Sequence, residues 1–213
     1  MGKIENGING GFTGTVGSVT GYYLNGKWII RSKRRKSIKN KTGSADQKAC
    51  RSRFTIMQTF LSPIVAFIRI GFNLESKKRM MTAHNVAKSY NMLNAQNAAG
   101  EIDYTAVRLS FGKLTGAEDV QLEHDDAGVH FSWKDNSNGN HARKYDQTML
   151  MAYDVDNKTA IYETGGARRF KEKDSLEIPS FYKGKTFHTW MAFISDDRME
   201  ISMSTYCGSF VFQ

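Results

Sequence analysis

The densest group of potential metal ligands in the sequence lies between residues 123 and 130. It consists of Glu123, His124, Asp125, Asp126 and His130. Imidazole nitrogens and carboxylate oxygens together are ligands of zinc and other transition metals. The same residues, followed by Ala-Gly, are equally typical of a polar turn before a strand, in which His130 faces away from Val129 and Phe131. We predict the turn and no metal site.

Two further acidic segments contain residue types that could bind calcium or act in acid–base catalysis. Residues 154–157 read Asp-Val-Asp-Asn, but the remaining ligands and the terminal glutamate of a calcium loop are missing, which favours a turn between strands. Asp196 and Asp197 fit a tight hairpin better than acid–base catalysis. No Ser/His/Asp or Cys/His arrangement can be assembled from the sequence. We therefore predict a protein that is not an enzyme and that uses no cofactor.

The feature that points to a partner is positive charge near the N-terminus. The chain has a net charge of +9, and residues 1–53 hold twelve Lys and Arg against two acidic residues, so this quarter carries +10 and the remainder −1. Clustered cations bind phosphates by releasing counterions. The predicted partner is nucleic acid or an acidic neighbouring surface, and the alternative is a solvated tail. The predicted binding residues are Lys27, Trp28, Arg31, Lys33, Arg34, Arg35, Lys36, Lys39 and Lys41.

Aromatic side chains lie beside these cations. Tyr22, Tyr23 and Trp28 are suited to stacking on unpaired bases, and the alternative is that they pair across the strands of a hairpin. Asn25-Gly26 is a strong hairpin signal, because a type I′ turn needs positive φ at both central residues. We predict a β-hairpin over 15–32. The glycines between 10 and 26 lack the flanking elements of a nucleotide loop and indicate close approach of another backbone.

From residue 44 the spacing of apolar residues becomes helical. Ser44–Gln47 is a capping-box signature, and apolar side chains recur at helical spacing from Cys50 to Ile68. Pro63 either kinks this helix or begins another. Residues 76–96 are predicted to form a separate helix with a weak apolar face. The pattern predicts a helical hairpin that must dock on another surface. Cys50 and Cys207 are predicted to be free, buried thiols.

From about residue 104 the apolar period changes to two. The predicted strands lie within 104–111, 129–133, 148–153, 159–162, 175–178, 185–194 and 200–206. Gly, Asn and Asp clusters separate them. About seven short strands with such turn signals predict a β-sandwich.

Residues 176–195 resemble the E–F region of fibronectin type III and related immunoglobulin-like domains. A leucine strand leads through Pro179 into an aromatic-rich strand, and Trp133 resembles the core tryptophan of that fold. The expected corner tyrosine would lie near Thr186 or Phe187, where this sequence departs from the pattern. The resemblance implies an immunoglobulin-like sandwich.

The whole chain also resembles a family of uncharacterised proteins of about this length from Bacteroidota. The resemblance rests on the glycine-valine block Gly11–Gly21, followed by Trp28-Ile-Ile-Arg31, on Phe-Leu-Ser-Pro-Ile at 60–64, and on the Ala-x-Ser-Tyr-Asn segment at 87–91. It implies the architecture and brings no activity with it.

These observations give one overall prediction. The chain is mainly β with an α-helical segment: a Gly-rich basic arm with a hairpin (1–43), a helical hairpin (44–100) and an immunoglobulin-like, fibronectin III-like β-sandwich (101–213). Because no apolar signal segment is seen and the apolar run at 60–72 is too short to span a membrane, we expect a cytoplasmic protein, or part of an assembled particle, without a membrane span.

The functional hypothesis is a non-catalytic structural or assembly protein. In it, the chain is a subunit of a homo- or hetero-oligomeric particle, virion or phage-derived, and its N-terminal arm contacts nucleic acid or neighbouring subunits. One alternative is a free-standing cytoplasmic protein that binds nucleic acid. Another is a surface or adhesion module that binds through the loops of the sandwich. The fold alone does not choose between them.

Overall fold

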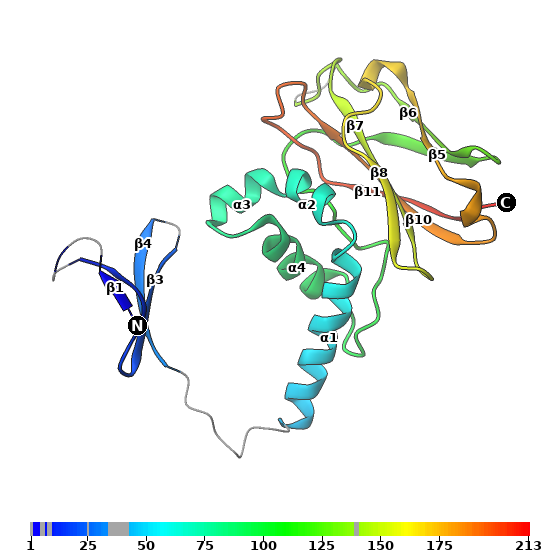
Figure 1. Ribbon diagram of the computed structural model, residues 1–213. Helices are drawn as coiled ribbons and strands as arrows, with labels where there is room; N and C mark the ends of the chain where they lie inside the picture. Colours follow the sequence, from blue (N-terminus) through cyan, green and yellow to red (C-terminus); the bar gives the residue numbers. More distant parts are fainter. Residues whose placement is uncertain (1, 5–6, 8–9, 25, 34–42, 139–140) are drawn as a thin grey trace. The chain divides into compact units, whose positions relative to one another are not determined.

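The computed structural model describes residues 2–4, 7, 10–24, 26–33, 43–138 and 141–213. Over these residues the protein is mainly β, with three antiparallel sheets and four α-helices (Figure 1). Contacts between residues divide the chain into two units, Met1–Ala45 and Asp46–Gln213.

The N-terminal unit is a four-stranded antiparallel sheet in chain order. Its strands are β1 (Gly2–Ile4), β2 (Phe12–Val16), β3 (Val19–Leu24) and β4 (Lys27–Ser32). The predicted hairpin is present, because β3 and β4 pair in a continuous register that ends at Leu24↔Lys27. Gly26 in its turn has φ +80°, a conformation that glycine adopts without steric cost. The glycine-containing segment 10–26 was predicted to be extended or strand-like, and β2 lies within it. The prediction did not include β1 or the four-stranded sheet.

The described helical segment contains four helices where a helical hairpin, with a kink or a further helix at Pro63, was predicted. They are α1 (Ala45–Leu61), α2 (Val65–Gly71), α3 (Asn73–Arg79) and α4 (Ala83–Asn94). The break before α4 has no glycine or proline: Met80 takes a left-handed conformation with φ +51°, and the Thr82 hydroxyl accepts a hydrogen bond from the Asn85 amide at 3.3 Å. Thr82 therefore acts as the N-cap of α4.

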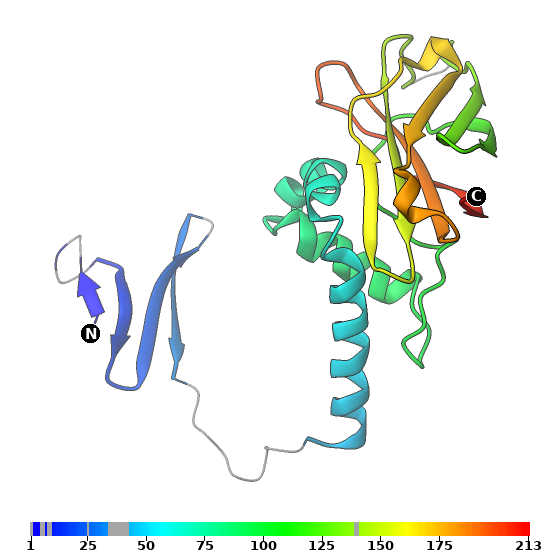
Figure 2. The ribbon, with the colours of Figure 1, turned by 45° about the vertical axis from the view of Figure 1, so that its right-hand side comes forward.

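Two antiparallel sheets make up the rest of the second unit. The three-stranded sheet has the order β5-β6-β9, and the four-stranded sheet has the order β11-β10-β7-β8. Their bounds are β5 (Glu118–His124), β6 (Gly128–Lys134), β7 (Gln147–Asp154), β8 (Thr159–Glu163), β9 (Lys173–Glu177), β10 (Thr186–Ile194) and β11 (Thr205–Val211). Figure 2 shows the two sheets as adjacent layers, which is consistent with the predicted β-sandwich.

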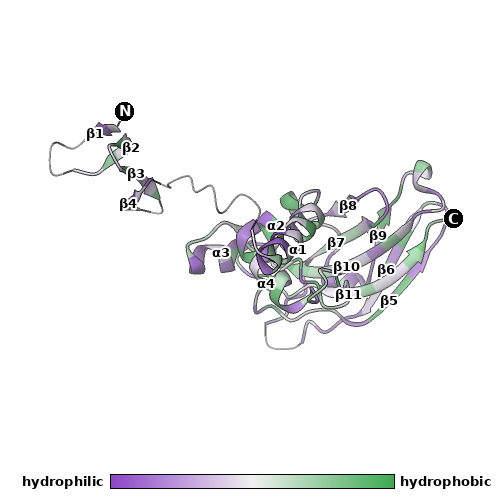
Figure 3. Cartoon of the chain, turned by 90° about the horizontal axis from the view of Figure 1, so that it is seen from below, coloured by the Kyte–Doolittle hydropathy of each residue, from purple (hydrophilic) through white to green (hydrophobic). Residues whose placement is uncertain are grey.

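The four-stranded sheet is buried on both faces. Along β7, Met149, Met151 and Tyr153 belong to a core shared with the helices, whereas Leu150 and Ala152 belong to a core shared with the three-stranded sheet. Side chains alternate along a strand, so a strand covered on both sides must be apolar at successive positions. The helices thus dock on the outer face of this sheet, with β5 and β6 beyond its other face (Figure 3).

One predicted strand is wrong. Residues 104–111 have the alternating pattern and bury Val107 and Leu109, but they form turns and irregular structure. Two backbone amides of this segment bond to side chains instead of a neighbouring strand: the Arg108 amide donates to Asn91 Oδ1 at 2.8 Å and the Leu109 amide to Ser204 Oγ at 2.8 Å. Alternating burial therefore arose without a strand.

The strand that the prediction did not include is β5, of which only the last two residues fall in the segment assigned to a polar turn. Its residues are mostly exposed, and the Glu118–Gln121 part contains a register shift opposite β6. An exposed edge strand needs few apolar residues, so its pattern is weak. The last strand was predicted at 200–206 and lies at Thr205–Val211; Ile201 makes only an isolated bridge to Ile194.

No single helix in the described part of the chain has the length and apolarity required to cross a membrane. The pair α1 and α2 reaches that length and composition together, but is bent by 89°.

Candidate interaction surface

The two faces of the N-terminal sheet differ in chemistry. Because side chains alternate along each strand, the register assigns every residue to one face. The apolar face consists of Gly2, Ile4, Phe12, Gly14, Val16, Val19, Gly21, Tyr23, Trp28, Ile30 and Ser32. The basic face consists of Lys3, Thr13, Thr15, Thr20, Tyr22, Leu24, Lys27, Ile29 and Arg31. Within these strands, the basic face has three cations and no acid, and the apolar face has no charge.

The basic face presents its cations to solvent. Lys3, Lys27 and Arg31 are all exposed, and the Arg31 guanidinium carbon lies 5.4 Å from the centre of the Tyr22 ring. At this distance the ring face attracts the cation and holds the side chain against the sheet. Lys33 follows β4 directly and is also exposed. The described cations therefore form a positive surface that no carboxylate on the sheet neutralises.

The apolar face is flattened by glycine. A Cβ atom on Gly11 would lie 1.8 Å from the Trp28 ring, and one on Gly21 would lie 2.8 Å from the Phe12 ring. These aromatic rings therefore lie directly on the backbone, a close approach that only glycine permits. Trp28 and its register partner Tyr23 also contact edge to face, with ring centres 5.1 Å apart.

The structure separates the predicted binding residues into groups. Lys27 and Arg31 share the basic face, whereas Trp28 lies on the apolar face. Arg34, Arg35, Lys36, Lys39 and Lys41 lie outside the described residues. Of the two interpretations of the aromatics, cross-strand pairing describes Tyr23 and Trp28; Tyr22 alone lies with the cations. Sequence reasoning missed the two-faced sheet, although the spacing of Lys27 and Arg31, four residues apart on one strand, was a signal that both cations share a face.

Comparison with protein families places this chain. A model described as a family of unknown function, DUF6266, matches residues 11–208. The chain belongs to the DUF6266 family. This match agrees with the predicted relation to an uncharacterised family, and it begins at Gly11, the first residue of the glycine-valine block. A search of curated proteins finds no match.

In this DUF6266 protein the acidic segment at 123–130 forms a strand end and a turn. Asp125 Oδ1 accepts hydrogen bonds from the amides of Ala127 and Gly128 at 2.8 and 3.0 Å, and its Oδ2 lies 2.9 Å from His130 Nε2. The bond to His130, aided by the backbone bonds, lowers the pKa of Asp125. Among the residues that the structure describes, no group of three or more His, Cys, Asp or Glu is placed to hold a metal ion.

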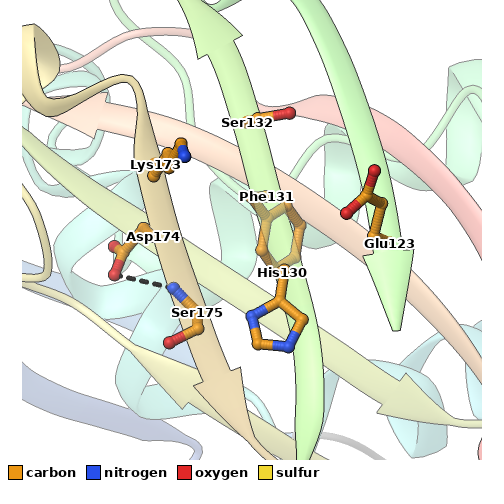
Figure 4. Close-up of a pocket in the computed structure, with 7 residues that line it drawn as sticks. All are labelled: Glu123, His130, Phe131, Ser132, Lys173, Asp174 and Ser175. Atoms are coloured by element: carbon orange, nitrogen blue, oxygen red, sulfur yellow. Dashed lines mark hydrogen bonds between the residues drawn. The ribbon is translucent and has the colours of Figure 1, made fainter. Parts of the chain in front are cut away.

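A shallow polar groove of about 590 Å³ lies on the outer face of the three-stranded sheet (Figure 4). Glu123 and His130 are register partners, and Ser175 pairs with His130 from the other side. A nucleophile–base pair needs hydrogen-bond contact between the two groups. The described bonds join His130 to Asp125 and to neither serine, so the groove lacks that arrangement in its observed form.

The Asp154–Asn157 segment forms the predicted turn, between β7 and β8. Asp154 accepts hydrogen bonds from the amides of Asp156 and Asn157 and from the Asn157 side chain. Its carboxylate is thus used within the turn. The cysteines are both free, but Cys50 is exposed on α1, contrary to the prediction, because the first turns of that helix have no packing partner among buried residues.

A cluster of aromatic side chains lies where α1 and the 104 segment meet the four-stranded sheet. The His188 ring stacks on Tyr104 with centres 4.1 Å apart, and its Nδ1 lies 2.8 Å from the Tyr206 hydroxyl. Burial lowers the pKa of His188 and raises the pKa of Tyr104 and Tyr153. The neutral forms of all three are favoured, as expected for a packed core.

Proposed function

We propose that this protein is a non-catalytic structural or assembly protein, a subunit of a multi-subunit particle of virion or phage-derived type. Its basic face, together with the cationic residues that follow β4, contacts nucleic acid or an acidic surface of a neighbouring subunit. The observation that carries the proposal is the segregation of Lys3, Lys27 and Arg31 on one face of a small sheet whose described strands contain no acidic residue.

The charge arrangement supports a polyanionic partner. Lys27 and Arg31 project from the same side of β4, four residues apart, and strand geometry places them about 13 Å from one another. Phosphates along a nucleic acid strand are separated by several ångströms, so one backbone can contact both. Each neutralised phosphate releases counterions and adds affinity that depends on salt and not on sequence.

The second unit supports a structural role. We interpret its two sheets as an immunoglobulin-like, fibronectin III-like sandwich. Of the seven strands β5 to β11, the first, second and fifth (β5, β6 and β9) form one sheet, and the other four (β8, β7, β10 and β11, in spatial order) form the second. Trp133 is buried between the sheets, and its Nε1 donates to the Arg169 carbonyl at 2.8 Å. Such folds serve as rigid scaffolds in many binding and structural proteins.

The test measures binding of a labelled DNA or RNA oligonucleotide to the full chain as salt is varied. The variant Lys27→Gln/Arg31→Gln/Lys33→Gln should bind more weakly and lower the salt slope by about 2 to 3, close to one for each lost contact. A matched control removes three exposed lysines of the second unit, Lys113, Lys134 and Lys173. A flat salt response, or equal weakening in both variants, would refute nucleic-acid contact by the basic face.

An acidic neighbouring surface is the other partner within this proposal. A poly-glutamate peptide tests it with the same variants, because binding to it should fall in the same order. Binding to the peptide without binding to nucleic acid would assign the basic face to a protein neighbour.

One observation favours the free-standing nucleic-acid-binding protein as a second candidate. Tyr22 lies on the basic face beside Arg31, where an aromatic ring and a guanidinium can both stack on a base. A Tyr22→Leu variant distinguishes the candidates: it should weaken binding to single-stranded but not duplex DNA if stacking contributes. Small complexes of fixed stoichiometry, instead of large assemblies, would favour this candidate.

A further inference from the structure

The apolar face of the N-terminal sheet is exposed although it carries large side chains. The exposed fractions are 55% for Ile4, 51% for Val16, 56% for Tyr23, 37% for Trp28 and 61% for Ile30. Among the described residues of this unit only Gly21 is buried, so the sheet has no hydrophobic core of its own. A small sheet is stable in water only when its apolar face packs against another layer.

We infer that the apolar face packs against the same face of a second copy of this chain. Two four-stranded sheets then form a two-layer, eight-stranded structure related by a twofold axis, with both basic faces turned outward. The inference deepens the proposed assembly function and rests on it, because it names the first contact from which the assembly is built. A twofold contact of this kind uses the same patch on both subunits, so each favourable contact occurs twice.

The shape of the face fits packing of sheet against sheet. Face-to-face sheets pack at about 10 Å, which leaves room for one layer of side chains from each sheet. Glycines allow the Phe12 and Trp28 rings to lie close on the backbone, and the Tyr23 ring meets Trp28 at 61°, so it rises from this layer and can insert between side chains of the facing sheet. A copy of the chain supplies an equally apolar, uncharged partner face.

The distribution of charge selects a second copy over a lipid surface. Lys3, Lys27 and Arg31 point away from the apolar face. A membrane in contact with the apolar face would leave these cations far from the anionic headgroups, whereas membrane-binding surfaces place basic residues beside the buried apolar ones. In the dimer the same arrangement is favourable, because it keeps the two positive surfaces apart.

The exposed area sets the expected strength. Large side chains present about 150–250 Å² each, and the five listed ones are about half exposed, which gives roughly 500 Å² for each copy. Two copies bury about 1,000 Å², close to the lower limit for a specific interface. The structure therefore predicts a reversible dimer with a dissociation constant in the micromolar range, of about 1–100 µM.

The chain offers a matched pair of residues for the test. Ile30 and Ile29 are neighbouring isoleucines on β4 that lie on opposite faces; Ile30 is 61% exposed and Ile29 is half-buried. Sedimentation equilibrium of the full chain without nucleic acid, up to about 200 µM, should show a monomer–dimer equilibrium. Ile30→Asp should weaken dimerisation by about tenfold or more, because a buried carboxylate lacks a partner. Ile29→Asp should change it by less than about threefold.

A cysteine cross-link gives a readout that does not require a destabilising charge. In a Cys50→Ser background, which removes the exposed native thiol, Ile30→Cys should form a disulfide-linked dimer on mild oxidation and Ile29→Cys should not. A chain that stays monomeric at the highest concentration, or equal cross-linking from both positions, overturns the inference. A monomer that still binds nucleic acid through the basic face refutes only the dimer, and a dimer without polyanion binding refutes only the proposed function.

Discussion

Removal of Asp146 should destabilise the second unit more than any change at an exposed ion pair. The Arg169 guanidinium is completely buried, and Asp146 is 1% exposed. Asp146 Oδ2 lies 3.2 Å from Arg169 Nε and 3.1 Å from Nη2. Asp146→Ala therefore leaves a positive charge inside the protein with no carboxylate beside it.

The magnitude follows from the contacts that remain. A buried ion pair that loses one partner costs about 3–5 kcal/mol. The Arg169 side chain still donates to the Thr115 carbonyl at 2.8 Å and to Asn136 Oδ1 at 2.5 Å, and it still packs on the Phe193 ring at 3.8 Å. Because most of its donors keep acceptors, we expect the lower end, about 3 kcal/mol. For a unit of this size that loss lowers the melting temperature by roughly 6–12 °C.

Urea unfolding followed by tryptophan fluorescence measures the loss. Trp133 is a suitable reporter because its Nε1 donates to the Arg169 carbonyl, and Trp28→Phe in all variants removes the signal of the N-terminal sheet. The control is Arg143→Met, which breaks exposed ion pairs to Asp197 at 3.5 Å and Glu200 at 3.4 Å and should cost less than about 1 kcal/mol. If Asp146→Ala costs no more than this control, the buried pair does not stabilise the fold as reasoned.

Three further outcomes are expected. Burial holds the folded-state pKa of His188 below its unfolded value of about 6.5. The unfolded chain therefore binds more protons, and the free energy of unfolding should fall as the pH drops below about 6.5. Urea unfolding of the His188→Phe variant should show a weaker dependence on pH. Gly21→Val places a Cβ 2.5 Å from the Phe12 carbonyl oxygen and should make the N-terminal sheet sensitive to protease without changing the unfolding of the second unit. A thiol reagent should label Cys50 rapidly, but Cys207 only on unfolding, because burial raises the pKa of Cys207 to about 12 and the thiolate is the reactive form.

Local signals in the sequence predicted the elements whose geometry is decided locally. Asn25-Gly26 located the hairpin of β3 and β4, because its turn depends on the conformation of two residues. The long apolar runs at 148–153 and 185–194 located β7 and β10, because strands buried on both faces have few polar positions. These predictions did not depend on knowing what packs against the strands.

The errors arose where a distant residue decides the local structure. Val107 and Leu109 alternate as in a strand, yet the Asn91 and Ser204 side chains take up the hydrogen bonds that a strand would need. Tertiary contacts override local propensity at such positions. The break between α3 and α4 was missed for a local reason: Met80, which follows the last residue of α3, takes a left-handed conformation that no glycine marks.

The candidate site was predicted in part. The sequence identified Lys27 and Arg31 as members of one cationic surface, but it also included Trp28, which lies on the opposite face. Charge is visible in composition, whereas the face of a residue depends on strand register. Residues 10–26 were predicted only as a strand-like segment without a pairing partner, and β1 was not predicted, so the register of a four-stranded sheet was not available from the sequence.

The two units treat their apolar residues in opposite ways. In the second unit β7 is covered on both faces, so Met151 and Ala152 are both buried although they point in opposite directions. In the described strands of the N-terminal sheet all charged side chains lie on one face, yet Tyr23 and Ile30 on the charge-free face remain more than half exposed. An antiparallel sheet whose charges are confined to one face usually buries the other. The same rule that explains the cores of the second unit therefore requires a cover for the apolar face, and an identical face on another copy meets that requirement without burying a charge.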